Sequence, residues 1–193
     1  MQQLMVNRQL LTSKENFFYD LVADHKFKYI HCCNSAAMAY HHDDRSNLGR
    51  IGIIMYGIDP AGNETKEFKQ VMSLYSKVAL IKKIKAGDRV GYGLTYTADE
   101  DEYLATIPIG YADGLIRKNQ GRNVYINGKY FEIVGRVCMD QIMVRVDETI
   151  KEGDKVEIFG AHISLASMAR ELETIPYEII CLITKRVDRL YIK

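Results

Sequence analysis

The second half of the chain is a succession of short β-branched and apolar runs separated by tight-turn residues. Two of these runs flank Asn127-Gly128, the dipeptide that favours a type I′ hairpin turn. Such short runs are stable only when they pair, and two-residue turns pair them antiparallel. We therefore predict a mainly antiparallel β domain over residues 76–193. Its predicted elements are strands at 78–84, 104–109, 124–126, 130–134, 142–146, 156–159 and 179–183, and a helix over 164–172.

Residues 1–75 differ because helix and strand signals alternate there, as in a parallel α/β unit. The signals are a helix with a Thr12/Glu15 capping box, a strand at 28–33, a helix capped by Asn34 and Ser35, and a strand at 51–56. Two strands and two helices are too few to close a barrel or to cover both faces of an open sheet. We therefore expect domain 1–75 to be the remnant of a larger unit, which makes the fold class a mixture of α and β.

Composition excludes several classes of protein. Hydrophobic residues make up 47% and charged residues 26% of the 193 positions, an ordinary globular balance. The formal net charge of +1 disfavours sequence-independent nucleic-acid binding. The sequence has neither a membrane-length apolar run nor a signal-peptide pattern at its start, which predicts a cytoplasmic protein without a membrane partner.

The cysteines and histidines do not predict a metal site. Cys32 and Cys33 are adjacent and the four cysteines form no C-x-x-C pair, which suits neither a zinc cage nor a disulfide framework. We expect reduced thiols, as in cytosolic proteins. The run His41-His42-Asp43-Asp44 is expected to be a solvated loop, because consecutive residues rarely converge on one ion.

Several local motifs place polar groups at the ends of apolar runs, and each has a structural alternative. Ser35, at a strand-to-helix junction, suits a phosphate but also an ordinary N-cap. Gly52, inside an apolar run, marks a close approach of backbone to a ligand or a packing contact. Tyr92, between two glycines, suits an exposed proton shuttle or a packed turn residue.

Taken together, five motifs resemble bacterial alanine racemase, a pyridoxal-phosphate enzyme in which a (β/α)8 barrel precedes a β domain. The matching strings are HCCNSAA at 31–37, RIGIIMYG at 50–57, GYGLTYT at 91–97, IPIGYADG at 107–114 and VGRVCMDQ at 134–141. They stand in the family's order. The resemblance implies an isomerase that interconverts L- and D-alanine, a precursor of peptidoglycan, with pyridoxal 5′-phosphate as cofactor.

The resemblance also implies a role for each matching residue. Tyr92 corresponds to one of the two catalytic bases. The implied cofactor ligands are Ser35, Gly52 and Ile53 at the phosphate and Arg50 at the pyridine nitrogen. The implied substrate residues are Met139 at the carboxylate and Tyr111 near the substrate, with Arg136 and Asp140 lining the entrance. Lys185 stands where many members of the family carry a phosphate-binding tyrosine, so phosphate binding there is expected to differ.

The family's cofactor-binding lysine lies early in the barrel, in a string that this sequence does not contain. The chain is therefore expected to match only the end of the barrel plus the β domain, and to be inactive alone. The resemblance implies a homodimer in which Tyr92 serves the partner's barrel, or a complementing barrel half. The alternatives are a non-catalytic β module for association or regulation, and a racemase that acts on serine.

Overall fold

The computed structural model describes residues 2–41, 44–62 and 67–192, with side chains from residue 10 onward. It divides into two compact units, Met1–Lys69 and Gln70–Lys193, which we call unit 1 and unit 2 and describe separately. The expected boundary between residues 75 and 76 lies inside the first strand of unit 2, β1 (Leu74–Lys77).

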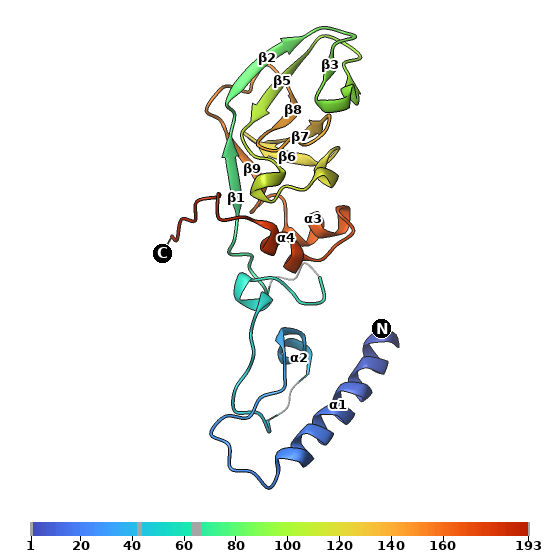
Figure 1. Cartoon of the computed structure of the whole chain (residues 1–193), viewed down its shortest axis with the longest axis vertical. Helices are drawn as coiled ribbons and strands as arrows, with labels where there is room; N and C mark the ends of the chain where they lie inside the picture. Colours follow the sequence, from blue (N-terminus) through green and yellow to red (C-terminus); the bar gives the residue numbers. More distant parts are fainter. Residues whose placement is uncertain (1, 42–43, 63–66, 193) are drawn as a thin grey trace. The chain divides into compact units, whose positions relative to one another are not determined.

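Unit 1 contains the helices α1 (Gln2–Val22) and α2 (Ser35–Tyr40) and the 3₁₀ helix η1 (Ile53–Tyr56) (Figure 1). The predicted cap of α2 is confirmed, because Asn34 Oδ1 accepts a hydrogen bond from the Ala37 amide at 3.1 Å. The predicted capping box of the first helix is wrong. The helix begins ten residues earlier, so Glu15 lies in its middle, where it is buried.

The two strands predicted in unit 1 are also wrong, since its described residues contain no β-strand. At the first of them, an asparagine side chain takes the place of a neighbouring strand. Asn47 Oδ1 accepts from the Ile30 amide at 2.8 Å, and Asn47 Nδ2 donates to the Lys28 carbonyl at 3.0 Å. At the second, Gly52 has ψ −94°, and the chain continues into η1. Apolar runs predict strands only where a paired neighbour satisfies their backbone.

Unit 2 is built on an antiparallel sheet of seven strands, in the order β1-β9-β6-β7-β8-β5-β2 (Figure 1). The strands are β1, β2 (Leu80–Ile84), β5 (Glu102–Ile107), β6 (Asn123–Ile126), β7 (Lys129–Val134), β8 (Ile142–Val146) and β9 (Lys155–Phe159). Strands β3 (Arg89–Val90) and β4 (Tyr96–Thr97) form a separate pair. The predicted Asn-Gly hairpin is confirmed, with φ of 47° at Asn127 and 90° at Gly128.

The two outer strands of this sheet, β1 and β2, belong to one continuous segment of chain. Only Val78 and Ala79 separate them. The Val78 amide donates to the Asp154 carbonyl at 2.9 Å, and the Ala79 amide donates to the Thr106 carbonyl at 2.9 Å. The segment therefore pairs with β9 at its start and with β5 at its end. The sheet curls, so that its two edge strands, β1 and β2, follow each other directly in this one segment.

Two helices lie side by side at one end of the sheet, α3 (Leu165–Glu171) and α4 (Pro176–Leu182) (Figure 1). The cap predicted for α3 is confirmed, because Ser164 Oγ accepts from the Ser167 amide at 3.0 Å. The strand predicted at 179–183 is wrong, since most of it lies in α4. Pro176 starts this helix with its fixed φ, and the buried residues Pro176 and Ile179 recur with helical spacing.

A buried carboxylate holds the turn that follows β9. Glu157 Oε1 accepts from the amides of His162 at 2.7 Å and Ile163 at 3.0 Å, and Oε2 lies 3.0 Å from His162 Nδ1. Burial raises the pKa of Glu157, but the hydrogen bonds from the His162 side chain and from these two amides outweigh burial and hold it below its ordinary value. The charged form is therefore the one that stabilises the fold.

We predict that Glu157→Gln lowers the free energy of unfolding by about 1.5–3 kcal/mol at neutral pH, the range for hydrogen bonds to a charged group. Because the folded-state pKa is depressed, this stabilisation is complete above the unfolded-state pKa and is lost as the pH falls through the folded-state pKa. Urea unfolding at neutral and acidic pH measures the difference between the wild type and the variant. Glu148→Gln, at an exposed position, is the control. A difference that stays constant with pH would contradict this account.

Candidate functional site

The turn between β3 and β4 exposes Tyr92. Both neighbours of this tyrosine have left-handed backbone, with φ of 76° at Gly91 and 74° at Gly93. Residues with a Cβ rarely adopt this conformation, so the turn requires both glycines. The turn includes the 3₁₀ helix η2 (Tyr92–Leu94), and 74% of the Tyr92 surface is exposed.

Segment 135–140, which connects β7 to β8, packs against this turn. A Cβ built on Gly91 would lie 3.3 Å from the Arg136 backbone nitrogen, and one built on Gly93 would lie 2.9 Å from Arg136 Nη1. The absence of side chains at these two positions lets the Arg136 guanidinium lie directly against the turn. Two residues predicted for the site, Tyr92 and Arg136, therefore stand on adjoining segments.

The other end of segment 135–140 packs against the loop that follows β5. The Tyr111 amide donates to the Cys138 carbonyl and the Ala112 amide donates to the Met139 carbonyl, both at 3.0 Å. A Cβ on Gly110 would lie 2.3 Å from the Met139 carbonyl oxygen, so only glycine fits there. Tyr111, in the 3₁₀ helix η3 (Tyr111–Asp113), is 43% exposed, and Met139 is 52% exposed. The structure thus brings these two predicted residues together.

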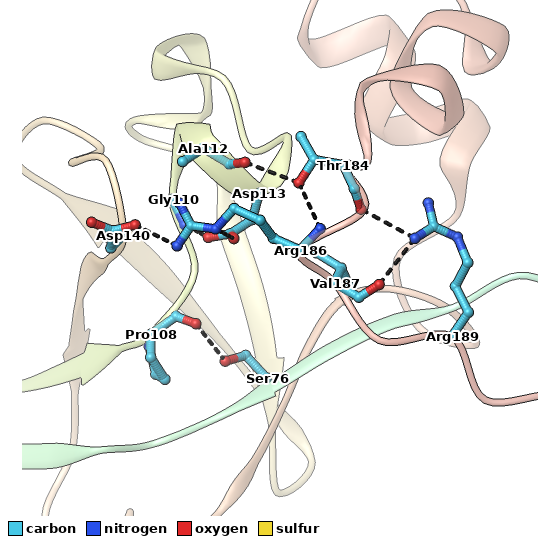
Figure 2. Close-up of polar contacts among 10 residues, drawn as sticks. All are labelled: Ser76, Pro108, Gly110, Ala112, Asp113, Asp140, Thr184, Arg186, Val187 and Arg189. Atoms are coloured by element: carbon cyan, nitrogen blue, oxygen red, sulfur yellow. Dashed lines mark hydrogen bonds and ion pairs between the residues drawn. The ribbon is translucent and has the colours of Figure 1, made fainter.

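Asp113 and Arg186 connect this loop to the segment that follows α4 (Figure 2). Asp113 Oδ2 accepts from the Gly110 amide at 2.9 Å, and Asp113 Oδ1 lies 3.4 Å from Arg186 Nε. Arg186 Nη2 donates to Asp140 Oδ1 at 2.6 Å. The hydrogen bond to Asp140 and the charge of Asp113 raise the pKa of Arg186. One guanidinium therefore joins the loop after β5 to the predicted entrance residue Asp140.

The segment after α4 completes the same arrangement. Thr184 Oγ1 donates to the Ala112 carbonyl at 3.0 Å, and the Thr184 amide donates to the Asp113 carbonyl at 3.1 Å (Figure 2). Lys185, the predicted phosphate residue of unit 2, is exposed between these anchored neighbours. Sequence reasoning did not select Asp113, Thr184 or Arg186 for the site. Asp113 lies in the matching string at 107–114, whereas Thr184 and Arg186 lie in none of the five strings.

The predicted phosphate ligands meet in unit 1. Ser35 is buried, and its Oγ accepts from the Gly52 amide at 2.8 Å. This bond leaves the hydroxyl hydrogen of Ser35 as a donor. The amide of Ile53 stands in the first turn of η1, where no carbonyl of the helix can accept from it. Arg50 Nη2 donates to the Cys32 carbonyl at 2.9 Å.

This donor set fits a phosphate. It offers the hydroxyl hydrogen of Ser35 and the main-chain N–H of Ile53, and the Gly52 N–H holds the Ser35 hydroxyl beside them. The predicted ligands of the cofactor therefore divide between the units. Ser35, Arg50, Gly52 and Ile53 belong to unit 1, and Lys185 belongs to unit 2.

Unit 1 departs from the sequence expectation at His41 but not at its cysteines. The four cysteines are free thiols. His41 was expected in a solvated loop, but its side chain is 13% exposed and its Nε2 lies 2.5 Å from Glu15 Oε2. This contact withdraws His41 from solvent. Residues 42 and 43 of the same predicted loop lie outside the described residues.

Comparison with known proteins identifies the family. The family model described as alanine racemase, C-terminal domain, matches residues 71–191. The alanine racemase of Ligilactobacillus salivarius is 46% identical over 173 residues, which cover 86% of this chain and 47% of that protein. That of Streptococcus mutans is 45% identical over 177 residues, which cover 88% of this chain and 48% of that protein.

Solved structures of alanine racemases are also similar to this chain. The alanine racemase of Bacillus anthracis with bound L-Ala-P has a TM-score of 0.86 at 38% identity, covering 97% of this chain and 51% of that one. The Bartonella henselae enzyme, with covalently bound pyridoxal phosphate, has a TM-score of 0.82 at 34% identity, covering 97% and 52%. Unit 2 is thus a C-terminal β domain of the alanine racemase type. The chain belongs to the alanine racemase family, which confirms the resemblance and the predicted fold class.

The chain spans about half the length of the curated relatives it matches. Among the described helices, none combines the length and the apolar character that crossing a bilayer requires.

We predict that Gly110→Ala destabilises unit 2 by roughly 2–3 kcal/mol, at the upper end of the range for overpacking, because the added methyl meets backbone carbonyls that cannot move aside. Gly128→Ala is the matched control. Its Cβ would meet nothing within 4 Å, so the cost is confined to the left-handed backbone, about 1 kcal/mol. Thermal unfolding of both variants gives the comparison. Equal losses would show that the close approach at Gly110 does not constrain the loop.

Proposed function

We propose that this chain supplies the C-terminal part of a pyridoxal-phosphate-dependent amino-acid racemase that interconverts L- and D-alanine, with Tyr92 as one of its two bases. The observation that carries the proposal is the exposed phenol of Tyr92, held on a turn that is packed against Arg136. Racemisation removes the α-hydrogen from one face of the substrate and returns one to the opposite face, which two bases on opposite sides accomplish directly.

The cofactor would be held by Ser35, Gly52 and Ile53 at its phosphate and by Arg50 at its pyridine nitrogen. Pyridoxal phosphate, when bound, withdraws electrons from the α-carbon and so makes the α-hydrogen acidic. A permanently charged guanidinium at the pyridine nitrogen donates a hydrogen bond and disfavours protonation of that nitrogen. Arg50 would thereby limit electron withdrawal and disfavour side reactions such as transamination.

The remaining residues of unit 2 would act on the substrate. The Tyr92 hydroxyl takes or gives the α-proton on one face. The Met139 N–H holds the substrate carboxylate, and Tyr111 narrows the space beside it. Arg136 and Asp140 line the entrance, where opposite charges suit an amino acid that carries both signs. These proposed roles are supported by the contacts of segment 135–140 with the turn of Tyr92 and with the loop of Tyr111.

The second base would be the family's lysine on a (β/α)8 barrel. The string that contains this lysine is not found in these residues, so another polypeptide segment would supply it. We propose a homodimer in which Tyr92 reaches the barrel of the partner subunit, or a complex with a separate barrel half. The proposed location is the cytoplasm, where D-alanine would supply peptidoglycan precursors. The proposed partner is a small amino acid, with neither nucleic acid nor membrane involved.

Complementation tests this function. The chain is co-expressed with a barrel half that carries the lysine, and pyridoxal phosphate is added. Racemase activity together with the visible absorbance of bound cofactor is expected for the pair, and neither is expected for the chain alone. A folded complex without activity would favour the alternative, a non-catalytic module for association or regulation.

We predict that Tyr92→Phe lowers the racemisation rate of the complemented enzyme by 10²–10⁴-fold, the usual contribution of a general acid–base group. The ring is retained and the position is exposed, so stability should change little. In D₂O, exchange of the α-hydrogen should continue from one enantiomer and stop from the other, because one base remains. Exchange is followed by NMR. Equal loss of exchange from both enantiomers would argue against a base at Tyr92.

Serine remains an alternative substrate, because a small pocket does not strongly reject one added hydroxyl. The ratio of kcat/KM for alanine and serine in the complemented enzyme decides between them.

We predict that Lys185→Ala weakens pyridoxal-phosphate binding by the complemented enzyme up to about tenfold, since an exposed lysine acts on phosphate as a screened point charge. The loss should shrink at high salt. Lys82→Ala, at an exposed position on β2, is the control. A cofactor titration at two salt concentrations measures both. Unchanged affinity for Lys185→Ala would remove this lysine from the phosphate site.

A further inference from the structure

A buried polar cluster in unit 1 has no part in the proposed racemase chemistry. Glu15, in the middle of α1, is 5% exposed. Its Oε1 accepts a hydrogen bond from Cys33 Sγ at 3.4 Å, and its Oε2 lies 2.5 Å from His41 Nε2. A carboxylate buried to this degree requires partners, and here the partners are a thiol and an imidazole.

The adjacent Cys32 places a second sulfur near this carboxylate. Cys32 Sγ lies 3.8 Å from Cys33 Sγ. One ligand atom from each of Glu15, Cys32 and Cys33 lies within 4.8 Å of the other two. In the sequence, their adjacency makes these two cysteines poor candidates for sharing one ion. In the structure, the two sulfurs nevertheless lie close enough together to share one.

We propose that Glu15, Cys32 and Cys33 form a binding site for Zn²⁺. Zinc takes thiolate sulfur at about 2.3 Å and carboxylate oxygen at about 2.0–2.2 Å, usually in a tetrahedron. Such a tetrahedron separates two sulfur ligands by about 3.8 Å and a sulfur from an oxygen by about 3.5 Å. The separations of 3.8 Å and 3.4 Å therefore match two edges of the coordination polyhedron. The third edge, between Cys32 Sγ and Glu15, lies within 4.8 Å, so binding requires at most a small closure of this edge.

His41 is a positioning residue for this site. Its Nε2 holds the Glu15 oxygen that does not face Cys33, and hydrogen-bonded partners of this kind orient a metal-binding carboxylate. Its Nδ1 is buried and makes no hydrogen bond among the described residues. A pocket of about 350 Å³ borders the cluster at Cys33 and His41, so solvent has access to this side of it.

Zinc binding at these cysteines should depend on pH. Burial, followed by the hydrogen bonds to Glu15 and Cys32, raises the pKa of Cys33 to about 12. The group is therefore a thiol at neutral pH, which makes it a poor nucleophile. A metal ion must displace this proton, so affinity for zinc should rise with pH and binding should release protons.

Cobalt(II) titration of the full chain under reducing conditions tests the proposal, because thiolate ligands give cobalt an intense near-ultraviolet charge-transfer absorption. We expect saturation at one equivalent, displacement by Zn²⁺, and proton release in weakly buffered solution. The double variant Cys32→Ser/Cys33→Ser should lose the absorption. Cys181→Ser, at an exposed cysteine outside the cluster, should keep it.

Further variants keep the test valid if the double variant misfolds. Glu15→Gln retains an oxygen and a similar shape but loses the charge of a ligand, so it should weaken cobalt binding while the chain stays folded. His41→Ala should weaken cobalt binding by about 10–100-fold, the usual effect of losing a partner of a ligand. His41→Gln, which restores a side-chain donor, should recover part of the affinity and of the visible cobalt spectrum.

The proposal is overturned if the folded wild-type chain gives no thiolate–cobalt absorption. It is equally overturned if the absorption survives in Cys32→Ser/Cys33→Ser, or disappears in Cys181→Ser. None of these measurements depends on racemase activity.

Discussion

The backbone of residues 138 and 139 lies so close to Gly110 that no side chain fits between them, and the arrangement of the loops in unit 2 follows from this contact. The Cys138 and Met139 carbonyls accept the amides of Tyr111 and Ala112, so the two loops satisfy each other's main chain. Tyr111 and Met139 themselves stay half-exposed. The strands explain why the loops meet, since β5 and β8 are neighbours in the sheet and each loop lies at the end of one of them.

The connection between β7 and β8 contacts both the loop of Gly110 and the turn of Tyr92. Both strands lie inside the sheet, where each has a neighbour on either side, so segment 135–140 is anchored at both ends. One part of the segment contacts the turn of Tyr92 through Arg136, and another contacts Gly110. A turn with glycine at Gly91 and Gly93 is flexible in an unfolded chain, and packing against Arg136 is what fixes it in the fold. A proton-transfer group needs this combination of exposure and fixed position.

The sequence predicted the sheet of unit 2 well because its signals are local. Alternating β-branched residues and the Asn127-Gly128 turn depend on near neighbours in the chain. The site motifs were also local, which is why Tyr92, Tyr111 and Met139 could be selected separately. Their connections were not predicted, because Arg186, which contacts Asp113 and Asp140, lies far from both in the sequence, beyond α4. That helix was itself taken for a strand, since a short apolar run fits either structure until Pro176 is recognised as its first turn.

Unit 1 shows the opposite case, in which a wrong prediction and an unexpected cluster have the same physical origin. In a regular strand, successive side chains point to opposite faces, so the sulfurs of adjacent cysteines point apart. Residues 28–33 do not form a regular strand. Segment 47–50 makes only isolated contacts with their backbone, through the Asn47 side chain at the Ile30 amide and through main-chain amides at the Ile30 and Cys33 carbonyls. Freed from the alternation of a strand, Cys32 and Cys33 turn their sulfurs to within 3.8 Å, where Glu15 meets them from α1. A sequence pattern that assumes regular secondary structure therefore misses such a cluster, and the departure from regularity is what creates it.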